Sequence, residues 1–457
     1  MGLAKEDRKI RYQKEIEMKQ VPLSSVLETT KQDKECSRNT THETSIWTKS
    51  MLIALDNGVK GGKWFSLIDK VYSLKTLNIA WQQVKSNKGS AGVDKVSIEK
   101  FEVNEELYLQ ELHQSVKEQR YNPQPVKRVY IPKAGGKRRP LGIPTVKDRI
   151  VQTAIKMAIE PIFEKEFLDM SYGFRPKRGC KDALRVVDNL LKEGYTWVVD
   201  ADLQSYFDTI NQDILMRHLE ERISDQPLLD LIKKYLKQDI IDNLKQWTPT
   251  NGTPQGAVLS PLLANIFLHP LDTMLKELDY KAVRYADDFV ILCKTEQEAN
   301  MALEKVREWV ANNDLQLHPD KTHIGNASIK GQGFEFLGYR FEAGHRFVRD
   351  KSLKSFKDKV RSKTKRTRSS SIESIIAELN PILRGWFNYF KHAHYSTFRR
   401  NDGFVRRRLR SIILKRNKKK NCFGITLNAH RLYPNSYFAN LNLFTSNEAW
   451  VKAYQSR

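Results

Sequence analysis

The chain has 457 residues, 40% of them hydrophobic, and a formal net charge of +24, so it has room for two to four domains with real cores and favours a polyanionic partner. Its four cysteines are far apart and form no C-x-x-C pair, which argues against a zinc knuckle and a disulfide framework and for a reducing compartment. No apolar run approaches transmembrane length and the polar start is no signal peptide, so we expect an intracellular, cytoplasmic protein.

Residues 1–60 are polar and weakly periodic, which predicts disorder or a loosely attached helical extension. Helical patterns from about 64 to 120 surround the loop 87–94, whose small residues suit either a plain turn or contact with a nucleic-acid backbone. A strand, a basic turn and a returning strand then predict a hairpin over 126–143. Its tip is either a solvated loop or a phosphate-binding fingertip, because it carries four cations: Lys133, Lys137, Arg138 and Arg139.

A long helical pattern follows over 146–167, with Thr145 as its expected cap. The next loop, 171–178, carries glycine and arginine and leads into a helix that ends near Gly194. Arg175 and Arg178 in this loop are either phosphate contacts or residues engaged in capping or surface pairing.

Two acidic clusters end apolar strands. Asp200 and Asp202 share one face of a strand over 197–202, because side chains alternate along a strand. Asp287 and Asp288 lie in a tight turn between two apolar runs, where a plain exposed turn is the alternative to a cation site. Carboxylates gathered from adjacent strands repel one another unless a divalent cation stabilises them. Oxygen-only ligands favour Mg²⁺ over zinc, and two such ions suit nucleotidyl transfer.

The rest of the chain alternates loops, helices and basic segments. A turn-rich loop at 251–256 precedes a helix that begins near Ser260, and an amphipathic helix is predicted over 296–312. Residues 351–420 hold 22 Lys+Arg against 4 Asp+Glu, a net of +18 (22 minus 4), which fits either nucleic-acid binding or a solvated helical face.

One helix in this basic segment has an apolar face from Ile372 to Phe390. Ser370 and Glu373 are its expected capping box, and Pro381 is expected to kink or divide it. The basic and aromatic end of the chain suits single-strand or DNA contact, or docking onto the preceding helices.

Taken together, these motifs resemble a group II intron-encoded reverse transcriptase/maturase over roughly residues 60 to 430. The blocks that carry the resemblance occur in the family's order: NKGSAGVD (87–94), IPKAGGKRRPLGIP (131–144), SYGFRP (171–176), TPQG (253–256), YADD (285–288), FLGY (336–339) and LRGWFNYF (383–390). The resemblance implies an α+β right-hand polymerase with fingers and palm at 61–347. It further implies an all-α thumb/maturase domain at 350–430 and a tail at 431–457 with a possible DNA contact.

The resemblance also implies roles for single residues. It selects Asp202 rather than Asp200 as a ligand of two Mg²⁺ ions, for which Mn²⁺ is a possible substitute; the other ligands are Asp287, Asp288 and the carbonyl of Leu203. Phe207 would exclude a ribose 2′-hydroxyl, and Lys321 would be the general acid. The remaining implied contacts are Lys133, Arg139 and Gln255 to the dNTP, and Arg175, Arg178, Tyr285, Gly338, Arg384 and Lys391 to nucleic acid.

The implied activity is RNA-directed DNA polymerisation combined with maturase action on a group II intron RNA. The implied partners are dNTPs, an RNA template with a DNA primer, the intron RNA and a DNA target, with no membrane, haem or zinc. Many members of the family continue into a Cys- and His-bearing endonuclease domain, and we expect a form without it. Two alternatives remain: an RNA-binding splicing cofactor with secondary or no polymerase activity, and a host-adopted reverse transcriptase in defence or repair.

Overall fold

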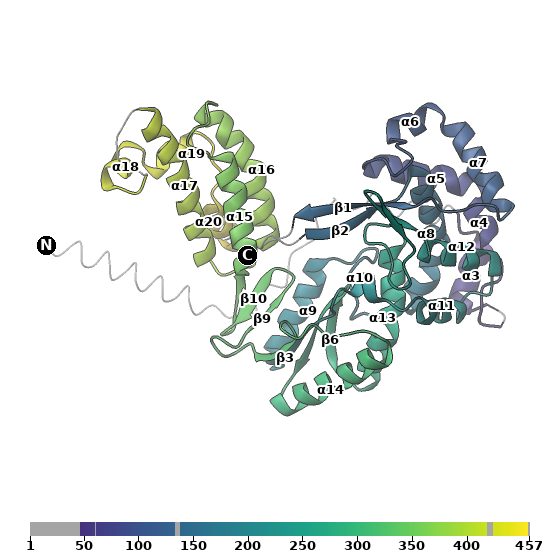
Figure 1. Ribbon diagram of the computed structural model, residues 1–457. Helices are drawn as coiled ribbons and strands as arrows, with labels where there is room; N and C mark the ends of the chain where they lie inside the picture. The colour runs from purple at the N-terminus through teal and green to yellow at the C-terminus, as the bar shows by residue number, and fades with distance from the viewer. Residues whose placement is uncertain (1–45, 60, 133–137, 418–423, 456–457) are drawn as a thin grey trace. The chain divides into compact units, whose positions relative to one another are not determined.

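The computed structural model describes residues 46–59, 61–132, 138–417 and 424–455 (Figure 1). Lys133, Lys137 and residues 1–45 lie outside the described residues. The chain divides into two compact units, of which one ends at Gly344 and the other begins at His345. No helix in the described ranges is long and apolar enough to cross a membrane.

Helices dominate the start of the first unit, as predicted. Trp47 is buried and donates its indole N–H to the carbonyl of Met157 at 3.1 Å, so residues 46–57 dock on the core and are not a loosely attached extension. Thr145 accepts a hydrogen bond from the backbone N–H of Asp148 and caps the long helix as expected. These helices are α3 (Lys49–Asn57), α4 (Ile68–Tyr72), α5 (Leu74–Asn87), α6 (Ile98–Val103), α7 (Glu105–Lys117) and α8 (Val146–Glu166).

A small sheet in the order β2-β1-β4-β5 follows the helices. Strand β1 pairs antiparallel with β2, which confirms the hairpin over 126–143, and parallel with β4. The four strands are β1 (Val126–Pro132), β2 (Arg138–Ile143), β4 (Ile240–Asp242) and β5 (Lys245–Trp247).

The central sheet of the first unit has the order β6-β7-β3-β8, and all its neighbours are antiparallel. Its strands are β3 (Trp197–Asp202), β6 (Lys281–Tyr285), β7 (Asp288–Cys293) and β8 (His323–Asn326). A second group of helices belongs to the same unit: α9 (Cys180–Lys192), α10 (Tyr206–Thr209), α11 (Gln212–Glu220), α12 (Gln226–Leu236), α13 (Ser260–Glu277) and α14 (Glu296–Asn312).

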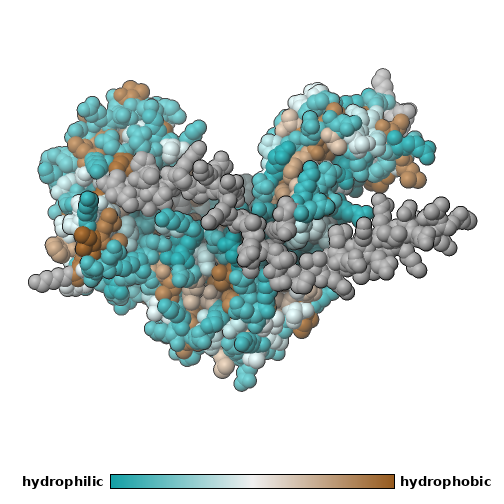
Figure 2. All heavy atoms as spheres, turned by 180° about the vertical axis from the view of Figure 1, so that it is seen from behind, coloured by the Kyte–Doolittle hydropathy of each residue, from teal (hydrophilic) through white to brown (hydrophobic). Residues whose placement is uncertain are grey.

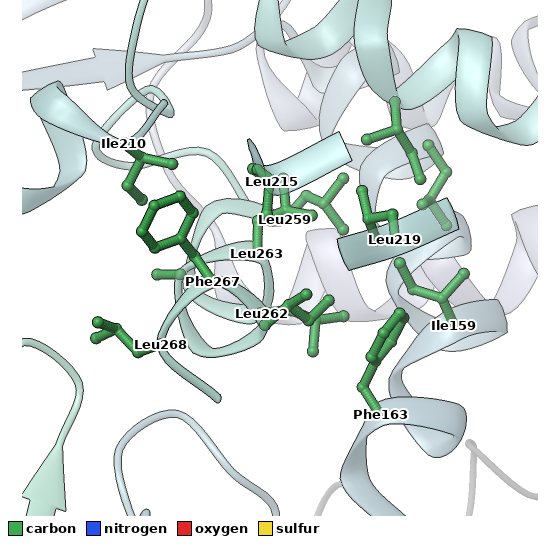
Figure 3. Close-up of a cluster of buried hydrophobic side chains, with 14 of the residues drawn as sticks. Ile159, Phe163, Ile210, Leu215, Leu219, Leu259, Leu262, Leu263, Phe267 and Leu268 are labelled. Atoms are coloured by element: carbon green, nitrogen blue, oxygen red, sulfur yellow. The ribbon is translucent and has the colours of Figure 1, made fainter. Parts of the chain in front are cut away.

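One apolar core joins these helices to the central sheet. Figure 3 shows Phe267 and Leu263 of α13 close to Leu215 of α11, with Phe163 of α8 nearby. Burial of apolar area at about 25 cal/mol per Å² makes such a cluster the main favourable contribution to folding. The first unit ends in a hairpin of β9 (Phe334–Phe336) and β10 (Tyr339–Glu342).

The second unit is almost entirely helical and has its own core. The apolar face of α16 is confirmed, because Ile375, Leu379 and Leu383 are buried in this core with Leu409. One detail differs from expectation, because Ser371 rather than Ser370 caps α16. Of the two expectations for Pro381, the division of the helix is not seen, since α16 runs through this residue. The elements are β11 (His345–Val348), α15 (Asp350–Lys363), α16 (Ile372–Phe390), α17 (Ser396–Arg416), α18 (Leu427–Leu432), α19 (Asn435–Asn440) and α20 (Ser446–Gln455).

The aromatic end of the chain docks onto these helices, which was one of the two expectations for it. Phe438 is buried in the second core, and Arg410 donates to the carbonyl of Tyr433 at 2.7 Å. Asp402 accepts from the backbone N–H groups of Ser446 and Asn447 at 3.0 and 2.8 Å and so holds the start of α20. The face shown in Figure 2 is mainly hydrophilic, with apolar groups in small scattered areas. Together the two units confirm the predicted α+β fold class.

Candidate active site

The site is built around the turn between β6 and β7. Because Tyr285 pairs with Asp288, the loop consists of only two residues, Ala286 and Asp287. Ala286 has φ 60°, a left-handed conformation that residues with a Cβ adopt only at a cost, typically about 1–2 kcal/mol. A turn of this kind persists only if its surroundings hold it in place.

Arg284 provides much of that support, and sequence reasoning missed it. Its Nη1 donates to the carbonyl of Ala286 at 3.0 Å and to Oδ1 of Asn265 at 2.9 Å. Its Nε and Nη2 pair with the two carboxylate oxygens of Asp272, and both side chains are 1% exposed. The available signal was an arginine within an apolar strand, since a fully buried charge requires a partner.

The segment at 170–173 packs directly beneath the turn. Tyr172 donates its backbone N–H to the carbonyl of Arg284 at 2.9 Å, and Asn265 donates to the carbonyl of Gly173 at 2.8 Å. A Cβ on Gly173 would come within 3.0 Å of the backbone of Ala286. This close approach explains why a glycine stands there.

The expectation that Arg175 contacts nucleic acid is contradicted. Its side chain is 2% exposed, its Nε donates to the carboxylate of Glu164 at 3.0 Å, and its Nη1 donates to the carbonyls of Leu168 and Ser171. The guanidinium therefore holds the loop together within the protein. Arg178 pairs at the surface with Asp169, at 2.6 Å.

Three predicted ligand carboxylates come from one end of the central sheet. Asp202 is the last residue of β3 and lies opposite Asp288 in the β3–β7 register, while Asp287 occupies the adjoining loop. Burial raises the pKa of Asp287, and the charge of Asp202 raises it further. Within the described residues, no group of three or more His, Cys, Asp or Glu side chains is arranged as a formed metal site.

The register also bears on the choice between the two aspartates of β3. Asp200 lies opposite Val290 and beside His323, and burial raises its pKa to about 6. Asp202, at the strand end, faces the acidic turn instead. This position supports Asp202 as the ligand.

Lys321 reaches the same strand end. Its Nζ lies 2.6 Å from Oδ1 of Asp202, and its loop is fixed by His318, whose backbone N–H donates to the carbonyl of Asp202 at 2.8 Å. Leu203 follows, buried and in an antiparallel bridge with Leu317. An ammonium group thus offsets part of the negative charge beside Asp202.

Three predicted nucleotide contacts also come together. Arg139 donates from Nε to Oε1 of Gln255 at 3.2 Å, and the backbone of Gln255 accepts from Gly142 at 2.6 Å. Phe207 is half-buried, and its carbonyl accepts from the backbone N–H of Thr253 in the same loop. The charge of Arg139, like that of Lys321, lowers the pKa of Asp287, so these groups act on one another electrostatically.

The remaining predicted contacts are Tyr285 beside the acidic turn, Gly338 in the β9–β10 hairpin, and two cations of the second unit. Tyr285 is half-buried, and burial together with the Cys180 side chain raises its pKa to about 12. Gly338, with φ 84°, forms the β9–β10 turn. In the second unit, Arg384 is exposed on α16 with its guanidinium 4.8 Å from the ring centre of Phe444, and Lys391 follows the last residue of that helix.

Comparison with known proteins assigns the family. Residues 131–341 match the reverse transcriptase (RNA-dependent DNA polymerase) family, and residues 353–431 match the maturase-specific domain of group II introns. Protein YkfC of Escherichia coli (strain K12) is 38% identical over 296 residues, which cover 56% of this chain and 77% of that protein. The chain belongs to the group II intron reverse transcriptase/maturase family.

Other relatives of this reverse transcriptase/maturase are matched over shorter shares of their length. The group II intron-encoded protein LtrA of Lactococcus lactis subsp. cremoris is 39% identical over 206 residues, covering 44% of this chain and 34% of LtrA. Among solved structures, a partial Cas6-RT-Cas1–Cas2 complex is 26% identical, covering 54% of this chain and 41% of that chain, with a TM-score of 0.35. Reverse transcriptases generally use divalent metal ions.

Proposed function

We propose that this reverse transcriptase copies RNA into DNA at the acidic end of its central sheet, with Asp202, Asp287 and Asp288 as the carboxylates that hold two Mg²⁺ ions. The observation that carries the proposal is the β3–β7 register, which sets Asp202 opposite Asp288 beside the two-residue loop. Carboxylate oxygens are the ligands that Mg²⁺ prefers, and Mn²⁺ accepts the same ligand set.

The electrostatics of the cluster support a cation there. Asp287 ionises less readily than a free carboxyl group because it is buried and close to the charge of Asp202. Divalent cations bound at such a site supply activation of the primer 3′-hydroxyl and neutralisation of the leaving group. The Leu203 carbonyl is proposed as a further oxygen ligand.

The protein's own groups would orient the substrates. Arg139 would exchange its hydrogen bond to Gln255 for the triphosphate oxygens, which leaves the Gln255 amide to contact the base-pairing site. Phe207 would fill the space that a ribose 2′-hydroxyl needs, and so favour dNTPs. Lys133 is proposed for the same triphosphate by its place in the sequence block 131–144.

Lys321 is proposed to donate a proton to the leaving pyrophosphate. Its Nζ is already at the strand end that carries Asp202, at 2.6 Å from that carboxylate. General acid catalysis requires the acid to lie within hydrogen-bond reach of the group that it protonates. A lysine at this strand end would be close enough to the leaving pyrophosphate.

The second unit is proposed to bind primer–template duplex and folded intron RNA, and its end to contact a DNA target. Its support is the +18 net charge of residues 351–420, the difference between 22 basic and 4 acidic residues. Arg178, Tyr285, Gly338, Arg384 and Lys391 remain proposed nucleic-acid contacts. Because its substrates are nucleic acids and dNTPs, we propose an intracellular location.

The deciding experiment is extension of a DNA primer on an RNA template with dNTPs and Mg²⁺ or Mn²⁺, with group II intron splicing at low Mg²⁺ measured in parallel. Asp287→Ala should abolish extension and leave splicing assistance intact. The matched control is Asp279→Ala, which removes an exposed carboxylate just before β6 and should leave both activities unchanged.

If wild type fails to extend a primer yet accelerates splicing, the polymerase proposal is wrong and the splicing-cofactor alternative holds. Extension without any effect on splicing would instead favour a host-adopted reverse transcriptase.

A further inference from the structure

One loop of the first unit, residues 252–258, connects three of the proposed nucleotide contacts. The backbone N–H of Thr253 donates to the carbonyl of Phe207 at 2.7 Å. Two residues further along the loop, the side chain of Gln255 accepts a hydrogen bond from Nε of Arg139 at 3.2 Å. The positions of Phe207, Arg139 and Gln255 relative to one another therefore depend on this loop.

Buried glutamines hold both ends of the loop. Gln212, the first residue of α11, is 5% exposed and donates from Nε2 to the carbonyls of Gly252 and Leu236, at 3.1 and 2.9 Å. At the other end, Gln152 of α8 is 1% exposed and accepts from the backbone N–H of Val258 at 2.8 Å. Loss of either amide would leave a backbone group of the loop without its partner, which is costly away from water.

Gln212 acts at the end of the loop that lies against Phe207. The backbone N–H of Gly252 donates to the carbonyl of Ile210 at 2.7 Å, and a Cβ on Gly252 would come within 2.6 Å of the carbonyl oxygen of Phe207. Ile210 is fully buried near Phe267 of the core (Figure 3), so the segment that carries Phe207 is itself anchored. The amide of Gln212 thus holds Gly252 at the place where the loop and this segment touch.

We propose that Gln212 is a positioning residue that sets the selection of dNTPs over rNTPs, because it holds the loop against the backbone of Phe207. A ring excludes a ribose 2′-hydroxyl only if it occupies the place of that one oxygen atom, so a small displacement admits the hydroxyl. A shift of about 1 Å in such a group can change a rate about a hundredfold. The inference rests on the proposed polymerase activity and on the proposed role of Phe207.

The test compares kcat/KM for dATP and for ATP in extension of a primer on an RNA template. Gln212→Met keeps the length of the side chain and removes the amide, and it should lower the dATP/ATP ratio roughly 10- to 100-fold. The fraction of folded enzyme cancels in this ratio, so a loss of stability alone would not change it. The matched control is Gln226→Met, which removes an exposed amide that donates to Asp230 and should leave the ratio unchanged.

A double-mutant cycle tests whether Gln212 acts through Phe207. Phe207→Ala alone should lower the ratio at least as far as Gln212→Met does. The double variant should fall no further than Phe207→Ala, since the ring that Gln212 positions is then absent. Gly252→Ala disturbs the same contact from the loop side, because its methyl group would overlap the carbonyl of Phe207, and it should also lower the ratio. This variant decides the matter if Gln212→Met does not fold.

The outcomes separate this inference from the proposed function. A wild type that does not extend a primer would overturn both, and so would a Phe207→Ala variant with the wild-type ratio, at the role of Phe207. If Phe207→Ala lowers the ratio while Gln212→Met and Gly252→Ala keep it, the proposed function stands and this inference alone is wrong. A double variant that shows the product of the two single losses would mean that Gln212 acts independently of Phe207, which also overturns the inference.

Discussion

At residue scale, the acidic turn depends on two residues outside the YADD block, Arg284 and Gly173. Ala286 holds its left-handed backbone because Arg284 binds its carbonyl and the backbone of Gly173 lies against it. Arg284 and Gly173 therefore affect Asp287 and Asp288 by fixing the position of the loop, and not by touching the substrate. Such support matters because a shift of about 1 Å in a reacting group can cost a hundredfold in rate.

Gly173→Ala tests this packing. The added methyl group would overlap the backbone of Ala286, so we expect the turn to move and the extension rate to fall roughly a hundredfold. Gly385→Ala is the matched control, because nothing lies within 4 Å of a Cβ there, and alanine in a helix should be neutral or stabilise by up to about 1 kcal/mol. Equal extension rates for wild type and Gly173→Ala would disprove the account.

Asp272→Asn tests the buried pair beneath the turn. It leaves the charge of Arg284 buried without its counter-ion, so we expect a loss of about 3–5 kcal/mol in the free energy of unfolding. The control is Asp169→Asn. Asp169 pairs with Arg178 at the surface and is 96% exposed, so the loss of this ion pair should lower the free energy of unfolding by only about 0–1 kcal/mol. Chemical unfolding measures both, and similar small losses would mean that the buried pair contributes little.

At the scale of elements, the start of α8 carries a buried carboxyl group. Asp148 accepts hydrogen bonds from Tyr121, Thr145 and the backbone of Gln124, and burial nevertheless raises its pKa to about 6. Since this pKa lies above the unfolded value of 3.8, the folded state binds more protons between the two values. The contribution of Asp148 to stability is therefore complete below the unfolded pKa and is lost as pH rises through about 6.

Asp148→Asn should remove this dependence, because the amide does not titrate. Between about pH 5 and pH 7, we expect the unfolding free energy of wild type to fall by about 1.4 kcal/mol relative to that of the variant. Chemical unfolding across that range measures the difference. A constant difference would show that Asp148 titrates near its unfolded value.

Periodicity and turn chemistry were sufficient to predict most elements. The helix at Glu296–Asn312 and the cap at Thr145 follow from local pattern alone. The error at Arg175 arose from a contact outside the local pattern, because the carboxylate of Glu164, eleven residues away, accepts a hydrogen bond from this side chain. The cap of α16 was misplaced by one residue, since Ser371 and not Ser370 caps the helix. The docking of the chain's end was left open because aromatic residues fit a core and a binding surface equally well.

At the scale of the whole molecule, the chain has two cores with different compositions around them. The first core surrounds the central sheet, and the second is built from α15 to α17 with the aromatic end of the chain. Most of the net charge lies in the second unit, since residues 351–420 account for +18 of the total of +24. The proposed functions, chemistry and polyanion binding, thus belong to parts with separate cores.

Separate cores predict two cooperative unfolding transitions in calorimetry. Leu379→Ala, in the second core, should lower one transition, and Leu275→Ala, in the first, should lower the other, because each deletes a buried side chain at a cost of about 2–5 kcal/mol. Each variant is the control for the other. Leu379→Ala should leave the transition of the first core in place, and Leu275→Ala should leave that of the second core in place. A single transition that both variants lower equally would show that the units unfold as one, and the separation of chemistry from polyanion binding would then hold for function but not for stability.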